Sequence, residues 1–197
     1  MHPKLPRMRY WDFVAPVYDL QLALERPAIE TVLDLVEPRP TDRLLDVATG
    51  SGAVLRALGA RAPHPSDAVG IDASAPMLAR VGALPAGWRL LCADARELPF
   101  PDARFDVVAC AYLLHLLDPG ERGHVLAEIA RVLVPRGRLA TITPVAPPTT
   151  FGAALRRIAG RYLLDPRADL ERAGFSVRTA RYVRAGYPSL CVLARRS

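Results

Sequence analysis

Leu44-Leu45-Asp46-Val47-Ala48-Thr49-Gly50-Ser51-Gly52 is the stretch that decides the fold, because a short apolar run leads there into a turn of small residues. The segment that follows, Ala53 to Ala60, has a helical pattern. Gly50 and Gly52 permit a tight turn and let a ligand approach the backbone, and the N–H groups at the start of the helix offer hydrogen-bond donors. The stretch predicts a strand, a ligand-binding turn and a helix.

Short apolar runs alternate with helical segments on both sides of this turn, which is typical of a parallel sheet covered on both faces. The predicted strands are Arg43 to Val47, Ala68 to Ile71, Arg89 to Cys92, Phe105 to Cys110, Arg138 to Thr143, Phe175 to Val183 and Ser189 to Ala194. The last two should form an antiparallel edge. We therefore expect a doubly wound α/β fold with a seven-stranded, mostly parallel sheet.

The helices are marked by their caps and by apolar spacing. The predicted helices are Pro27 to Val36, Ala53 to Ala60, Ala75 to Val81, Gly120 to Leu133 and Asp165 to Ala173. Ser74 can cap the third of them, and Pro76 suits its first turn. Pro135-Arg136-Gly137 should stop the fourth helix, and the prolines at 144, 147 and 148 should take the chain out of the sheet.

A chain of 197 residues, 51% hydrophobic and 23% charged, is long enough to bury one core and has the composition of a globular protein. We expect a single domain organised as an N-terminal helical lid (residues 1–39) and a ligand-binding catalytic domain (residues 40–197). The lid segment is rich in aromatic residues, namely Tyr10, Trp11, Phe13 and Tyr18. These side chains could form a wall for a planar or lipophilic substrate, or only dock the lid on the domain.

No apolar run is long enough to cross a bilayer and no signal peptide is evident, so a cytoplasmic location is expected. Cys92, Cys110 and Cys191 lie among apolar neighbours and lack metal-ligand spacing, so we expect core thiols and no metal site. The net charge of +6 arises mainly after Phe151, where ten arginines outnumber three carboxylates. This excess indicates either a solvated arginine-rich surface or an attraction for anionic partners.

Asp72 ends the strand that follows the glycine turn, at the sheet edge where a ribose diol would be bound. Up to this point a nucleotide-dependent oxidoreductase fits almost as well. However, Ala48 stands where a dinucleotide fingerprint has its first glycine, and Leu55 where it has Gly or Ala. Asp46 also precedes the turn, and its carboxylate would favour a ligand with an ammonium group over a pyrophosphate.

At these residues the sequence resembles the class I S-adenosylmethionine-dependent methyltransferases, especially the group around the ubiquinone and menaquinone biosynthesis enzymes. Further family motifs stand at Val69 to Leu78, Ala93 to Phe100, Phe105 to Val108 and Glu128 to Leu139. One departure is Arg136, where the family usually has glycine. Another is the short sequence between the fifth strand and the last helix, so substrate contacts should fall on the lid and on Pro144 to Arg161.

The resemblance implies S-adenosyl-L-methionine as the cofactor and a role for each matching residue. Asp46 and the backbone of Ala48 to Gly52, including Thr49 and Gly50, would hold the methionine part, and Asp72 with Ala73 the ribose. Asp94 and Ala95 would bind the adenine edge, with apolar contacts from Met77 and Cys92. Cys110, Ala111 and Tyr112 would line the sulfonium end, and Tyr18 would close over the cofactor.

Methyl transfer is an in-line displacement, so positioning and exclusion of water can supply most of the rate. A general base is needed only when the acceptor arrives protonated. His115 is the main candidate for the catalytic base, and Tyr18 and Tyr112 are less favoured candidates. A histidine among leucines is also typical of a hydrogen-bonded core residue.

The sequence favours transfer to a small or lipid-like acceptor by a monomer or homodimer, with weak peripheral membrane contact allowed by Lys4, Arg7 and Arg9. Three alternatives stay open: a non-catalytic S-adenosylmethionine-binding regulator, a phospholipid methyltransferase and an RNA methyltransferase. A nucleic-acid partner is disfavoured, because the chain lacks an Asn-Pro-Pro-Tyr or Asp-Pro-Pro-Tyr motif, paired catalytic cysteines and an added RNA-binding module.

Overall fold

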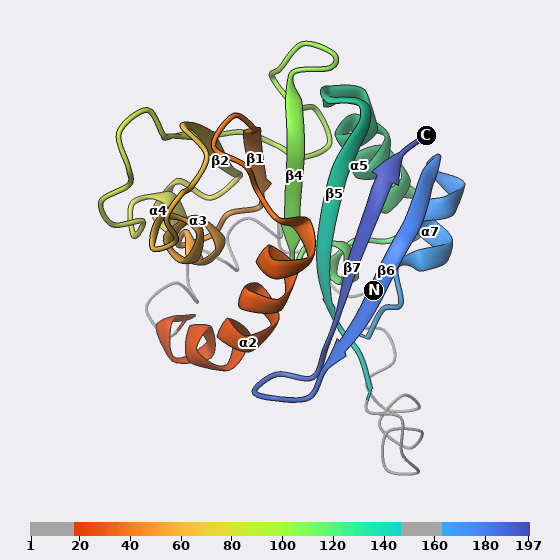
Figure 1. The fold of residues 1–197 in the computed structure, drawn as a ribbon. Coiled ribbons are helices and arrows are strands. Elements are labelled where there is room, and N and C mark those ends of the chain that lie inside the picture. The colour runs from red at the N-terminus through yellow and green to blue at the C-terminus, as the bar shows by residue number, and fades with distance from the viewer. Residues whose placement is uncertain (1–17, 147–162) are drawn as a thin grey trace, which may run out of the picture.

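The computed structural model describes residues 18–146 and 163–197, with the side chains of residues 18–22 left out. The described part forms a seven-stranded sheet in the order β3-β2-β1-β4-β5-β7-β6, with helices on both faces (Figure 1). The strands are β1 (Arg43–Val47), β2 (Asp67–Asp72), β3 (Arg89–Cys92), β4 (Phe105–Ala111), β5 (Leu133–Pro144), β6 (Phe175–Val183) and β7 (Ser189–Arg196).

The pairing of the strands confirms the predicted doubly wound fold. β1, β2, β3, β4 and β5 run parallel to one another, whereas β7 pairs antiparallel with both β5 and β6. Strand order turns at β1, which has β2 on one side and β4 on the other. In open α/β sheets, ligands bind at the carboxyl ends of the strands where the order reverses.

The helices are α2 (Tyr18–Val36), α3 (Ala53–Gly59), α4 (Ala75–Leu78), the 3₁₀ helix η2 (Leu114–Leu116), α5 (Pro119–Val132) and α7 (Arg167–Arg172). Ser74 caps α4 as predicted, because its side chain accepts a hydrogen bond from the Met77 amide. Helix α2 begins nine residues before its predicted start and contains Pro27. The predicted lid role of residues 1–39 stays a prediction, since residues 1–17 lie outside the described range.

Two apolar clusters flank the sheet, one on each face, because neighbouring residues of a strand point to opposite sides. Leu44 packs with α2 and α3, whose buried residues include Ile29 and Leu55. Leu45 packs on the other face with α5, including Ile129. One face of α2 therefore belongs to the core, namely Ala28, Ile29, Val32, Leu33 and Val36.

Strand β5 is longer than predicted. It begins at Leu133, directly after α5, and Pro135-Arg136-Gly137 lies inside it as an irregularity between its two stretches of pairing with β4. Arg136 has φ 62°, a left-handed conformation that glycine adopts readily. The turn therefore interrupts the strand's pairing instead of preceding the strand.

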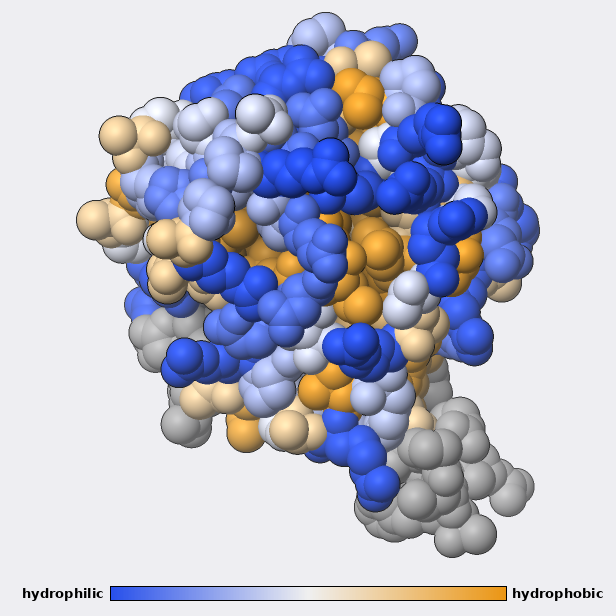
Figure 2. Space-filling view, viewed as in Figure 1, coloured by the Kyte–Doolittle hydropathy of each residue, from blue (hydrophilic) through white to orange (hydrophobic). Residues whose placement is uncertain are grey.

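Three of the described arginines of the C-terminal part lie at the outer edge of the sheet, on or next to β6. Arg178 and Arg181 on β6 and the neighbouring Arg184 are exposed. Charged side chains on an edge strand discourage pairing with other chains. Figure 2 shows apolar surface in a hollow over β5, beside α2, framed by hydrophilic side chains. Among the described residues, no helix has the length and apolar character needed to span a membrane.

Candidate active site

The loop after β1 is a backbone surface with few side chains. Ala48, Gly50 and Gly52 all have positive φ angles, of 58°, 57° and 83°. A Cβ added at Gly50 would lie 3.3 Å from the Met77 methyl, and one at Gly52 would lie 2.8 Å from a Val81 methyl. The conformation and the close packing together explain why small residues stand here.

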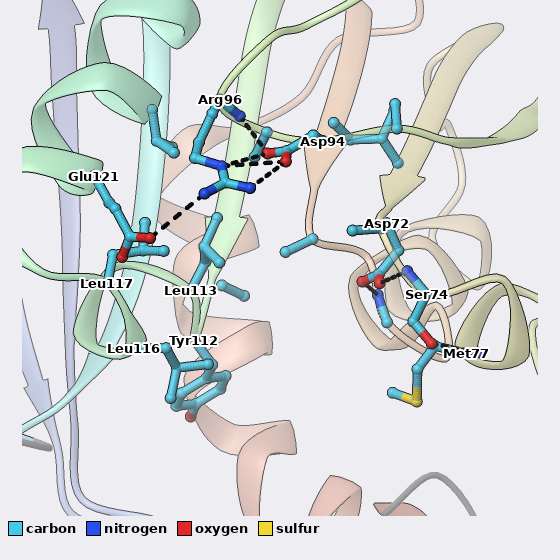
Figure 3. Close-up of a pocket in the computed structure, with 18 residues that line it drawn as sticks. Asp72, Ser74, Met77, Asp94, Arg96, Tyr112, Leu113, Leu116, Leu117 and Glu121 are labelled. Carbon is cyan, nitrogen blue, oxygen red and sulfur yellow. Dashed lines mark hydrogen bonds and ion pairs between the residues drawn. The ribbon is translucent and has the colours of Figure 1, made fainter. Parts of the chain in front are cut away.

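Asp72 is held by two backbone amides from two different elements. Its Oδ2 accepts a hydrogen bond from the Gly50 N–H at 2.8 Å, and its Oδ1 accepts one from the Ser74 N–H at 2.8 Å (Figure 3). The two amides hold the carboxylate at the carboxyl end of β2, where a ligand diol would donate to it. The contact to Gly50 also ties the end of β2 to the glycine loop.

Asp94 follows β3 and is held by a side chain. Arg96 donates to it from the backbone N–H at 2.9 Å, from Nε at 3.0 Å and from Nη2 at 2.6 Å. The Arg96 guanidinium holds the pKa of this carboxyl below its ordinary value. Asp94 is therefore an ionised acceptor at neutral pH.

The glycine loop and both carboxylates line one pocket, a cavity of about 200 Å³ at the carboxyl ends of the strands. Of the residues predicted to bind the cofactor, the pocket brings together Ala48, Gly50, Asp72, Ala73, Met77, Asp94, Ala95 and Ala111. Predicted residues that do not line it are Asp46, Thr49, Gly52, Cys92 and Cys110. The side chain of Tyr18 lies outside the described residues.

Asp46 lies under the loop, with 1% of its surface exposed. Its Oδ2 accepts a bond from Thr49 Oγ1 at 2.6 Å, and its Oδ1 has no hydrogen-bond partner among the described residues. Burial raises the pKa of this carboxyl to about 7, the hydroxyl of Thr49 lowers it, and the charge of Asp72 raises it. An unpartnered buried acceptor of this kind fits a cationic group of a ligand.

The cysteines differ partly from expectation. Cys110 and Cys191 are buried as predicted, and burial raises the pKa of both thiols. The prediction that Cys92 is a core thiol is wrong, because this residue is exposed. It ends β3, the edge strand of the sheet, where no further strand covers it.

His115 lies in η2 and is not among the residues that line the pocket. Its Nδ1 is buried without a hydrogen-bond partner among the described residues, and burial lowers its pKa to about 4. The imidazole packs edge-on against Tyr112 with ring centroids 6.5 Å apart. Tyr112 itself lines the pocket with φ 55°, and its hydroxyl lies 2.9 Å from Ser189 Oγ. Positive φ at a tyrosine is a strained conformation of the kind found at functional sites.

Several wall residues were not predicted from the sequence. They are Ile71, Ser74, Ala93, Arg96, Leu113, Leu116, Leu117, Glu121 and Val125. The leucines follow β4 and form an apolar wall, while Arg96 and Glu121 meet across the pocket (Figure 3). The only sequence signal was local: Arg96 stands two residues after Asp94, and Glu121 completes a capping box with Asp118.

Comparison with known proteins gives consistent matches. Residues 44–137 match a family model described as a methyltransferase domain. A demethylmenaquinone methyltransferase of Thermus thermophilus is 36% identical over 157 residues, which cover 73% of this chain and 68% of that protein. A nocamycin O-methyltransferase of Saccharothrix syringae is 37% identical over 146 residues, covering 71% of this chain and 51% of that protein. The chain thus spans about half to two thirds of the length of these relatives.

Solved structures agree on the fold. An S-adenosylmethionine-dependent methyltransferase from Mesorhizobium loti superposes with a TM-score of 0.64 at 20% identity, covering 88% of this chain and 98% of that one. The strand order, the single pocket shared by the glycine loop and two carboxylates, and these matches lead to one assignment. The chain belongs to the class I S-adenosylmethionine-dependent methyltransferases and resembles, within them, the quinone-biosynthesis group.

Proposed function

We propose that this chain transfers the methyl group of S-adenosylmethionine to a small or lipid-like acceptor with a hydroxylated ring of the quinol type. The observation that carries the proposal is the convergence of Gly50, Asp72 and Asp94 on one pocket beside an apolar wall. When bound, the cofactor supplies an electrophilic methyl group on a sulfonium. The chain's own residues bind it, orient it and exclude water.

The residues fit the three parts of the cofactor. The buried Asp46, with its unpartnered Oδ1, suits the ammonium of the methionine part. Asp72, fixed by two amides, suits the ribose hydroxyls, and Asp94 suits the amino group of the base. These roles follow the family pattern and are assigned here as proposals, with Ala73, Met77, Ala95 and Ala111 as contact residues.

The acceptor class is proposed from the chemistry of the wall after β4 and from the relatives. Leu113 and Leu116 are apolar, and Tyr112 adds a ring whose hydroxyl is anchored on Ser189. The names of two relatives specify naphthoquinone-type substrates, demethylmenaquinone and 2-phytyl-1,4-naphtoquinone. A planar ring with an ionisable hydroxyl is therefore the acceptor we assign, with one or two copies of the chain and no nucleic-acid partner.

A quinol-type acceptor arrives protonated, so a base must receive its proton. We propose His115 or Tyr18 for this role. Because burial lowers the pKa of His115 to about 4, its imidazole is neutral at pH 7 and able to accept a proton, but it is a weak base. His115→Gln is expected to reduce kcat about 100-fold if His115 is the base. An unchanged kcat would leave Tyr18, tested by Tyr18→Phe.

The proposal is tested by incubating the chain with methyl-labelled S-adenosylmethionine and four acceptors in parallel. These are a reduced prenylated naphthoquinone, an enolic polyketide analogue, phosphatidylethanolamine vesicles and transfer RNA. Label in the naphthoquinol supports the proposal. Label in lipid or RNA would replace the acceptor class, and tight S-adenosylhomocysteine binding without turnover on any acceptor or cell extract would indicate a non-catalytic binding protein.

A further inference from the structure

Arg96 reaches from one wall of the pocket to the other. Its Nε and Nη2 bind Asp94 in the loop after β3, and its Nη1 lies 3.5 Å from Glu121 Oε1 on α5 (Figure 3). All three side chains line or border the pocket that also contains Leu113 and Leu117. The guanidinium therefore joins the loop after β3 to α5.

The bond to Asp94 alone would be unremarkable, because the chain repeats it elsewhere. Asp165 and Arg167 have the same spacing, with Nε at 3.0 Å and 3.1 Å from the two carboxylate oxygens and Nη2 at 2.6 Å. That second pair lies at the start of α7 and does not line the pocket. Arg96 differs from Arg167 in two ways: it lines the pocket, and it contacts a second carboxylate, that of Glu121.

The geometry leaves Asp94 able to bind a base. A carboxylate has about four lone-pair sites. The backbone N–H and Nε of Arg96 contact Oδ1 at 2.9 Å and 3.0 Å, and Nε and Nη2 contact Oδ2 at 3.1 Å and 2.6 Å. Because one Nε hydrogen is shared between the two oxygens, these three donors leave room for one more. An amino group of a purine can then be accepted at Oδ2 without expelling the arginine. The flat guanidinium beside it can stack on the face of an aromatic base.

We propose that Arg96, held between Asp94 and Glu121, is a cofactor-binding residue whose guanidinium contacts the nucleoside base and retains it in the pocket. The Asp94–Arg96–Glu121 bridge is called the strap below. This inference rests on the proposed function. The Arg96–Glu121 contact is the weaker of the two contacts in this bridge, because it is longer than the contacts to Asp94 and the Arg96 side chain is 51% exposed. Exposed ion pairs are weak in water and strengthen when a ligand excludes solvent.

The strap is tested with two ligands. S-adenosylhomocysteine measures the whole site, and 5′-methylthioadenosine measures the base and ribose without charge. Arg96→Gln is expected to raise the Kd for both ligands about 5- to 30-fold, the range of a partly desolvated cation–π contact. Arg167→Gln, which removes the twin pair, is the matched control and should leave both Kd values unchanged. Circular dichroism checks that the variants fold.

Glu121→Gln tests whether Arg96 binds the base through its bridge to Glu121 or only holds Asp94 in position. The glutamine keeps an acceptor for the Asp118 N–H, so α5 remains capped, but the charge that holds Arg96 is lost. In the wild type, the Kd for uncharged 5′-methylthioadenosine should rise with salt, because the Arg96–Glu121 pair is screened. This salt dependence should disappear in both Glu121→Gln and Arg96→Gln.

Three results would overturn the inference. The Kd values of Arg96→Gln could equal those of Arg167→Gln, which would make Arg96 a bystander. Arg96→Gln could bind more tightly than the wild type, which would make Arg96 a competitor for Asp94. A wild-type Kd for 5′-methylthioadenosine that does not change with salt would show that the Arg96–Glu121 pair does not contribute to binding of the base. If the wild type bound neither ligand, the proposed function would fail together with the strap, a result distinct from the other three.

Discussion

Asp72 and Asp94 are two carboxylates at the carboxyl ends of neighbouring strands, one ending β2 and the other two residues after β3, and both line one pocket. The protein nevertheless holds them in different ways. Asp72 is fixed by backbone amides of Gly50 and Ser74, which also define the loop and the start of α4. Asp94 is held by the side chain of Arg96, and its own side chain is 42% exposed. The first carboxylate is part of the fold, whereas the second can adjust when a ligand arrives.

Asp72→Asn is expected to have the largest effect of any substitution in this comparison. An asparagine offers one acceptor oxygen where Asp72 uses two, so an amide NH₂ would face the N–H of Gly50 or Ser74. We expect the Kd for S-adenosylhomocysteine to rise about 100-fold or more and the melting temperature to fall. Titration calorimetry and thermal unfolding measure both.

Asp67→Asn is the matched control, since Asp67 begins the same strand and pairs with Arg104 and Arg89 away from the pocket. Its Kd should equal that of the wild type. Undiminished binding by Asp72→Asn would contradict the assignment of the ribose site.

Asp46→Asn extends the comparison to a carboxylate that is fully buried. The pKa of about 7 lies above the ordinary 3.8, so between about pH 4 and 7 the folded protein holds a proton that the unfolded chain has released. Stability should therefore fall as pH rises through this window. Asparagine cannot ionise, so the variant does not lose stability over this pH range. We expect its free energy of unfolding at pH 8 to exceed that of the wild type by about 1 to 3 kcal/mol.

Binding by Asp46→Asn should change in the opposite direction. The wild-type affinity for S-adenosylhomocysteine should increase as pH rises through about 7, because the ionised Asp46 attracts the ligand ammonium. The variant should bind more weakly at pH 8 and lose this part of the pH profile. Chemical unfolding and titration between pH 5 and 8 measure both effects. Equal pH profiles of binding for the two proteins would contradict the proposed contact between Asp46 and the ligand ammonium.

Asp94→Asn is expected to have a moderate effect, confined to binding. Loss of the charge weakens both the acceptor for the base and the anchor of Arg96, so the Kd should rise about tenfold. The melting temperature should stay near that of the wild type because the side chain is 42% exposed and is held by a side chain, not by the backbone of another element. Asp165→Asn, in the twin pair, should change neither value. A fall in melting temperature as large as that of Asp72→Asn would erase the distinction between the two carboxylates.

Arg136→Gly is expected to have the smallest effect, on stability alone. Arg136 is exposed and has φ 62°, so a glycine relieves backbone strain without removing a buried contact. We expect a gain of about 0.5 to 1 kcal/mol, seen as a rise in melting temperature of a few degrees. The Kd should not change, because the turn is remote from the pocket. A lower melting temperature would mean that the arginine side chain stabilises the turn.

The sequence predicted those features that depend on local pattern. The bounds of β1, β3 and β6 match their predictions residue for residue, because apolar runs between turn residues define them. β5 was misjudged because Pro135-Arg136-Gly137 reads as a stop, although the strand continues through it. The start of α2 was also misplaced: Pro27 suits a first helical turn, yet it lies within the helix.

The site residues also divide into those that a local sequence pattern predicts and those that it does not. Gly50, Asp72 and Asp94 could be placed at one edge because parallel strands end together. Arg96 and Glu121 were missed because their meeting depends on how α5 packs against the loop after β3, a relation that no local pattern encodes. The exposure of Cys92 was misjudged for a related reason, since only the strand order makes β3 an edge.

Glu121 has two oxygens with two tasks: Oε2 accepts the Asp118 N–H and closes the capping box of α5, while Oε1 faces Arg96. A ligand that tightens the strap would therefore also restrain the first turn of this helix. Amide hydrogen exchange at the start of α5 should slow when a nucleoside binds, although the helix lies on the far side of the arginine from Asp94. Local unfolding of a helix end would then become a reporter of occupancy in the pocket.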